Sequence, residues 1–170
     1  MQTDKRTQTM VFIALMTAVS CVLGPLALPL PFSPVPVSLT NLAVYFSVYV
    51  LGRKQGVLSR LIYLLLGLVG LPVFSSFTGG PAKLFGPTGG YLFGSLLLAW
   101  IQGFFLERWP RSRTMQFLGM ALGTAVLYLF GTLWLAKLAG LDLMAALAAG
   151  VIPFIPADLG KILLALIAGP

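Results

Sequence analysis

The chain has 170 residues, of which 58% are hydrophobic and only 9% are charged, and its mean hydropathy is +0.97. A soluble domain carries about 25% charged residues, so this composition excludes an ordinary soluble protein and predicts one integral membrane domain over residues 1–170. One cysteine and no histidine exclude the usual zinc and copper sites, and the placement of the basic residues argues against nucleic acid as the reason for the net charge of +7.

The first part of the chain is uncharged from Thr7 to Gly52, which is too long for one spanning helix of about 20 residues. Its middle cannot be helical, because it contains Pro25, Pro29, Pro31, Pro34 and Pro36. We therefore predict a helix over about 8–23, a stiff proline-rich loop to residue 37 and a second helix over 38–51. A basic turn at 52–54 then leads to a third helix over 55–69, whose Arg60 is expected to snorkel or to face the side of that turn.

The second part begins with an apolar, glycine-rich loop over 70–90, and such a loop is expected to fold over something. Helices are predicted over 89–106 and 114–138, with a short interfacial helix over 142–149. A last span starts near Pro156 and is short if it stops at Pro170, so its full length stays open. The predicted fold is an all-α polytopic membrane protein with six transmembrane helices and irregular outer loops.

The basic residues predict the orientation of this bundle. Eight of them lie at the N-terminus, in the third predicted helix, or in the connections between the second and third and between the fourth and fifth predicted helices. Two lie in the other connections. By the positive-inside rule the N-terminus is cytoplasmic and the 1–2, 3–4 and 5–6 connections face outward, as expected of a multi-pass protein of the cell membrane. The proline-rich loop, the glycine-rich loop and the start of the last helix then meet outside, where they can form a lidded pocket.

An acid and a base stand out near the end of the chain. Asp158 and Lys161 are three residues apart in apolar sequence, so a helix places both on one face. A charge at the centre of a membrane helix costs about 2.5–3.5 kcal/mol on insertion scales, and such residues usually mark a ligand or ion path. A structural clamp or snorkelling is the alternative. A membrane enzyme is disfavoured, because the four acids are dispersed and histidine is absent.

Four segments carry a resemblance to a known family: residues 32–41, 67–74, 86–91 and 153–161, in that order along the chain. They are similar to the BioY family of biotin-specific S components of energy-coupling-factor (ECF) transporters. The resemblance implies a non-enzymatic, six-helix subunit without a cofactor that captures extracellular biotin and works with a transmembrane T component and two cytoplasmic ATPases. Because the chain has no phosphate-binding loop motif, ATP hydrolysis must come from those partners. An S component for another small vitamin and a structural membrane subunit are the alternatives.

The resemblance also implies ligand contacts. Asp158 accepts a hydrogen bond from a ureido N–H of biotin, while Lys161 either donates to the ureido oxygen or pairs with the carboxylate. Tyr91 supplies a hydroxyl and an aromatic wall, or else is an interfacial anchor. A further candidate rests on the charge pattern and not on the resemblance: Lys83 is the one charge in the loop over 70–90, so it attracts the carboxylate or else is a solvated loop lysine.

The remaining candidates have equally plain alternatives. Thr40 and Asn41 reach the ligand or cap the second helix. The apolar side chains that line the ligand, or else pack in the core, are Phe74, Phe32 and Val35. Ala14 and Ala18 form a small-residue face that docks on the T component or packs within the bundle, and the pairs Gly90/Gly94 and Gly119/Gly123 share that spacing.

Overall fold

The computed structural model describes residues 2–169, with side chains from residue 4. Most of this range is helical, and the elements in chain order are α1 (Gln2–Leu23), β1 (Ala27–Leu30), β2 (Ser33–Ser38), α2 (Thr40–Leu68), α3 (Pro81–Leu84), α4 (Gly89–Arg108), α5 (Arg113–Ala139), α6 (Leu143–Gly150), the 3-10 turn η1 (Ile152–Phe154) and α7 (Ile155–Ala168). Four stretches are long and apolar enough to cross a membrane: Asp4–Leu23, Gly89–Arg108, Arg113–Ala139 and Leu143–Ala168.

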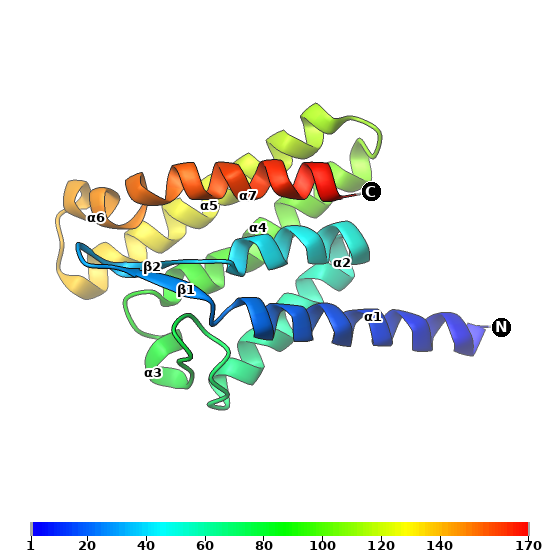
Figure 1. Ribbon diagram of the computed structural model, residues 1–170, viewed down its shortest axis with the longest axis horizontal. Helices are drawn as coiled ribbons and strands as arrows, with labels where there is room; N and C mark the ends of the chain where they lie inside the picture. The colour runs from blue at the N-terminus through cyan, green and yellow to red at the C-terminus, as the bar shows by residue number, and fades with distance from the viewer. Residues whose placement is uncertain (1, 170) are drawn as a thin grey trace.

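The predicted break between the second and third helices is confirmed. α2 bends at Gly52, whose φ of +76° and ψ of −177° interrupt the helix, and a side chain at this φ would be strained. Arg53 follows the bend, and its Nε lies 3.2 Å from the Glu107 carboxylate at the end of α4. α2 therefore consists of two arms, which run in different directions in Figure 1.

The mostly helical fold agrees with the prediction, but the stiff proline-rich loop predicted to residue 37 is wrong for residues 27–38. These residues form an antiparallel β-hairpin in which Ala27 pairs with Ser38, and a register shift lies between Leu28 and Leu30. Proline cannot donate to a strand ladder, but each strand of a two-stranded ribbon has a free edge where proline is tolerated. The prolines thus prevent a helix without preventing a hairpin.

The short helix predicted over 142–149 is confirmed as α6, and the last helix predicted from near Pro156 is confirmed as α7. The Asp142 carboxylate caps α6 by accepting from Met144 N at 3.4 Å. The 3-10 turn then redirects the chain into α7, which begins at Ile155 and so brings Asp158 into its first turn. Pro170, where the short last span was expected to end, lies outside the described residues.

The core is built from α2, α4, α5 and α7. Its wholly buried side chains include Tyr45, Val48, Leu98, Met120 and Ile162. α4 and α5 approach closely, since a Cβ on Gly94 would lie 3.2 Å from the Leu127 Cα. The irregular elements (the hairpin, α3 and α6) gather at one end of the molecule, while both termini lie at the other (Figure 1).

Candidate ligand-binding site

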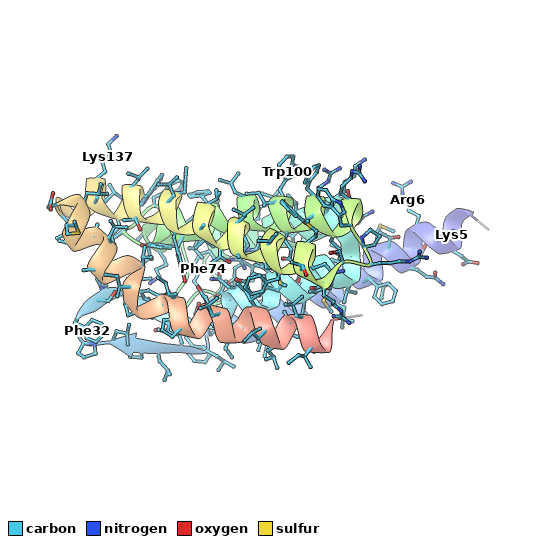
Figure 2. All side chains as sticks on the ribbon, turned by 90° about the horizontal axis from the view of Figure 1, so that it is seen from above. Lys5, Arg6, Phe32, Phe74, Trp100 and Lys137 are labelled. Atoms are coloured by element: carbon cyan, nitrogen blue, oxygen red, sulfur yellow. The ribbon has the colours of Figure 1, made fainter. Side chains whose placement is uncertain are left out.

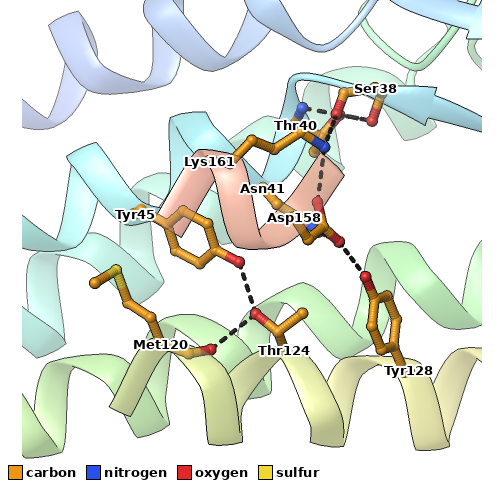
Figure 3. A network of polar contacts seen from close by, with 9 residues as sticks. All are labelled: Ser38, Thr40, Asn41, Tyr45, Met120, Thr124, Tyr128, Asp158 and Lys161. Carbon is orange, nitrogen blue, oxygen red and sulfur yellow. Dashed lines mark hydrogen bonds and ion pairs between the residues drawn. The ribbon is translucent and has the colours of Figure 1, made fainter. Parts of the chain in front are cut away.

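A polar cluster surrounds Asp158 in the first turn of α7 (Figure 3). Its Oδ1 accepts from Lys161 Nζ at 2.7 Å, and its Oδ2 accepts from Asn41 Nδ2 at 3.1 Å and from the Tyr128 hydroxyl at 2.5 Å. The side chains of Asp158 and Lys161 are only 6% and 11% exposed. Asp158 and Lys161 therefore lie on one face of α7, as their spacing predicts. Side chains from α2, α5 and α7 come together at the Asp158 carboxylate.

Lys161 connects this cluster to the hairpin. Its Nζ also donates to the backbone oxygen of Ser38, the last residue of β2, at 2.7 Å. An ammonium group has three donors, so one N–H of Lys161 is left over, and a carboxylate has about four acceptor positions, so one position of Asp158 is left over. The pair therefore offers one donor and one acceptor next to each other.

Two small cavities of about 60 Å³ each lie beside this cluster. Both are lined by Val35, Pro36, Ser38, Asn41 and Tyr91. Asp158, Lys161 and Tyr128 line the first, whereas Thr40, Arg60, Ser75 and Thr88 line the second. Because the two cavities share five residues, they form neighbouring halves of one recess that carries a carboxylate–ammonium pair in one half and a guanidinium in the other.

Tyr91 stands between the two halves and ties their walls together. Its hydroxyl donates to the backbone oxygen of Gly150 at 3.1 Å and lies 3.3 Å from Thr132 Oγ1. The ring fits against α5 because residue 131 is glycine, where a Cβ would come within 2.4 Å of the ring. The recess is therefore bounded by α4, α5 and the end of α6 as well as by the hairpin.

Comparison with known proteins identifies the family to which this fold and site belong. A family model described as the BioY family matches residues 1–170. The chain belongs to the BioY family. A protein named biotin transporter BioY from Thermotoga maritima is 40% identical over 136 residues, which cover 80% of this chain and 79% of that protein. Biotin transporter BioY2 from Lactococcus lactis subsp. cremoris is 37% identical over 161 residues, covering 95% and 87%.

A solved structure agrees with these sequence relatives. It is described as the S-component for biotin from an ECF-type ABC transporter, and it superimposes with a TM-score of 0.91 at 31% identity, covering 98% of this chain and 91% of its own. The resemblance seen in the sequence motifs is thus confirmed over nearly the whole chain. The protein is a membrane protein of the BioY family.

The recess of this BioY family member contains most of the residues that the sequence singled out. Asp158, Lys161, Asn41, Tyr91 and Val35 all line it. Thr40 lines its second half, although the Thr40 hydroxyl oxygen also accepts from Ser38 Oγ at 2.9 Å. The burial of the Asp158–Lys161 pair excludes the snorkelling alternative but not the structural clamp.

Three predicted residues lie elsewhere. Phe74 is wholly buried in a separate core, 5.6 Å from the Tyr63 ring between centroids. Phe32 sits at the exposed tip of the hairpin (Figure 2). Lys83, in α3, lines neither half of the recess, and partial burial lowers its pKa from the ordinary lysine value. Phe74 therefore matches its alternative as a core residue, whereas Phe32, which is 67% exposed, matches neither the ligand-lining role nor core packing.

Tyr128, Ser38 and Arg60 are site residues that the sequence did not reveal. No local pattern indicates the hydrogen bonds of Tyr128 and Ser38, because their partners lie 30 and 123 residues away, although Ser38 does fall within the segment 32–41. Arg60 did have a signal, since it is a charge in an apolar run just as Asp158 is. The expectation that it snorkels is wrong: Arg60 is 3% exposed and lies inside the bundle, where its planar head stacks on Tyr63.

A second feature, an open apolar groove, lies between α1 and the second arm of α2. It has a volume of about 640 Å³, and its lining includes Ala14, Ala18, Thr17, Leu58 and Ile62. Ala14 and Ala18 are exposed on it. The glycine pairs of the same spacing are used inside the bundle, since Gly94 and Gly123 face residues of the opposing helix. Among these small-residue pairs, Ala14/Ala18 is the one left uncovered within the described chain.

Proposed function

We propose that this protein is the substrate-binding subunit of an ECF-type transporter and that its recess binds extracellular biotin. The single observation that carries the proposal is the buried Asp158–Lys161 pair in a recess, in a chain whose relatives are named biotin transporters. A buried ion pair seldom adds much stability by itself, because desolvation offsets the attraction. A ligand that uses both groups gives such a pair a function.

Biotin matches the groups that remain free in this pair. Its ureido group has two N–H donors and one carbonyl acceptor on adjacent atoms. Lys161 Nζ, which keeps one unused N–H, lies 2.7 Å from Oδ1 of Asp158, the carboxylate that keeps one unused acceptor position. A ureido oxygen and a ureido N–H can therefore engage the two groups without breaking the existing bonds. The apolar side chains nearby, Val35, Leu127 and Phe154, suit the sulfur-containing ring.

The proposal includes an orientation and partners. The basic residues Lys5, Arg6, Arg53, Arg111 and Arg113 support a cytoplasmic position for the end with the termini. All six long helical segments, including both arms of α2, would then cross the cell membrane with the recess facing outward. The groove that contains Ala14 and Ala18 would receive a transmembrane T component, coupled to two cytoplasmic ATPases.

A binding screen on detergent-purified protein tests the substrate. Isothermal calorimetry with biotin, riboflavin and thiamine should show tight binding of biotin alone, and unlabelled biotin should displace a labelled biotin. Binding of another vitamin without biotin would replace the substrate. Binding of none, by protein that is folded by circular dichroism, would favour a structural subunit.

A further inference from the structure

The buried guanidinium of Arg60 has N–H groups without a hydrogen-bond partner among the described residues. Its Nε donates to Ser95 Oγ at 2.6 Å, and its guanidinium carbon lies 4.3 Å from the centroid of the Tyr63 ring. Nη1 and Nη2 are buried, and neither has a hydrogen-bond partner among the described residues. Four N–H donors on a buried cation are therefore unsatisfied, which is costly unless a partner arrives.

None of the acidic side chains within residues 4–169 forms an ion pair with this cation. The sequence contains four acids. Asp158 pairs with Lys161, Glu107 with Arg53, and Asp142 caps α6. Asp4 is exposed in the first turn of α1. Because arginine stays protonated in proteins, and no acidic side chain within residues 4–169 pairs with Arg60, a bound anion would supply its counter-charge.

The head of Arg60 is held in place for such a partner. Ser95 Oγ accepts from Nε while donating to Leu92 O at 2.5 Å. The Tyr63 ring that stacks against the guanidinium is itself fixed, because its hydroxyl donates to Val73 O at 2.7 Å. A guanidinium fixed through Nε and one face presents its two terminal nitrogens as a fork, and this fork matches the two oxygens of a carboxylate.

Arg60 lies where its terminal nitrogens can contact a ligand in the recess. Arg60 lines the half of the recess that adjoins the Asp158–Lys161 half, and the two share Asn41 and Tyr91 among their walls. We propose that Arg60 anchors the carboxylate of the bound ligand while Asp158 and Lys161 hold its opposite, uncharged polar end. The recess is thereby specific for a carboxylic acid with a neutral hydrogen-bonding head. This inference rests on the proposed function, and it assigns the ligand carboxylate to Arg60 instead of Lys161 or Lys83.

The test compares biotin with biotinamide, which has the same head and chain but no negative charge. Wild-type protein should bind biotin at least tenfold more tightly than biotinamide by calorimetry. Arg60→Gln keeps a polar side chain at the position but removes the charge, and it should weaken biotin at least tenfold and biotinamide less than twofold. Arg60→Lys should keep a preference for biotin, reduced to a few-fold, because an ammonium replaces the fork with a single point charge. Arg60→Lys also serves if Arg60→Gln does not fold.

Matched controls separate the possible outcomes. Lys137→Gln removes a cation at the exposed end of α5 (Figure 2) and should change neither affinity. Equal weakening of both ligands by Arg60→Gln would show a structural role only and would overturn the inference. The inference would also be overturned if both Arg60 variants kept the wild-type preference for biotin over biotinamide, or if Lys83→Gln abolished that preference instead. Wild-type protein that binds neither ligand would contradict the proposed function itself, which is a different result.

Discussion

The recess and the α1–α2 groove are built on opposite principles. The recess is small, lies under the hairpin and holds paired polar groups whose charges are almost fully buried. The groove is about ten times larger than either half of the recess, open, and lined by alanine, leucine, isoleucine and similar side chains. Buried, directional polar groups select a small molecule by its hydrogen bonds, whereas small residues on an open face allow a second helix to approach by shape. If the proposed function is correct, the two regions can be inactivated separately.

The groove gives the largest expected effect. Ala14→Trp or Ala18→Trp fills the open face with a bulky ring and should abolish co-purification with the T component, because close helix approach is lost. Biotin binding should stay within twofold of wild type. Co-purification by affinity tag and calorimetry on the same preparation provide the two measurements.

Leu129→Trp is the matched control for this experiment. Leu129 is a 62% exposed residue of α5, away from the groove, so a tryptophan there should leave both measurements unchanged. Full co-purification of the Ala14 and Ala18 variants would remove the groove as the docking face.

The recess gives the next largest effect. Asp158→Asn and Lys161→Ala should each weaken biotin binding at least tenfold, or by about 1.4 kcal/mol, because each removes a group that we propose contacts the ligand and leaves its partner unpaired. Both variants should still co-purify with the T component. Calorimetry measures the affinity.

Asp4→Asn is the control, since it changes an exposed acid of α1 by the same chemistry. Wild-type affinity in Asp158→Asn would remove this carboxylate from the site. Loss of both activities in folded protein would mean that the two regions are not independent.

A third change affects neither region and tests the assignment of Phe74 to the core. In Gly67→Ala the new Cβ would lie 2.0 Å from Phe74 Cζ, and Phe74 is wholly buried. Overpacking of this kind typically costs about 1–3 kcal/mol. The melting temperature in detergent should fall, while the biotin affinity of the folded protein stays unchanged. A selective loss of biotin affinity would return Phe74 to the ligand site.

The smallest effect is expected at Tyr128. Tyr128→Phe removes one of the three hydrogen bonds to Asp158 and keeps the ring. One hydrogen bond contributes about 1 kcal/mol, so the biotin affinity should fall roughly fivefold, less than in Asp158→Asn. A competition assay with labelled biotin has the necessary precision. A loss as large as that of Asp158→Asn would mean that Tyr128 contacts the ligand directly.

The helices and the central pair could be predicted because their signals are local. Long apolar runs predict helices, the glycine at 52 predicts the bend, and the spacing of Asp158 and Lys161 places them on one face whatever the fold. The hairpin could not be predicted with the same rules. Its prolines exclude a helix but do not distinguish a loop from a two-stranded ribbon, because pairing depends on the register between residues 27 and 38.

The rest of the site depends on contacts between distant parts of the chain. Tyr128 and Ser38 acquire their roles only when α5 and the hairpin reach α7. Arg60 was misread for a different reason: its neighbours in sequence are the basic residues of the turn, and proximity to them suggested the interface. The helix instead turns Arg60 toward Ser95 on α4, a direction that depends on how the two helices pack.

Two hydrogen bonds at the ends of β2 have a consequence for ligand binding and release in the recess. Ser33 Oγ donates to the Ala149 oxygen at 2.6 Å near the hairpin tip, and Lys161 holds the Ser38 oxygen at the other end of the strand. Lys161, which we propose contacts the ligand, also donates to β2 at Ser38, so a ligand that fixes the position of this ammonium would fix the strand as well. Departure of the ligand and opening of that strand would then be coupled, so exchange of the backbone amide hydrogens of Ser33, Val35, Val37 and Ser38 should slow in the presence of biotin.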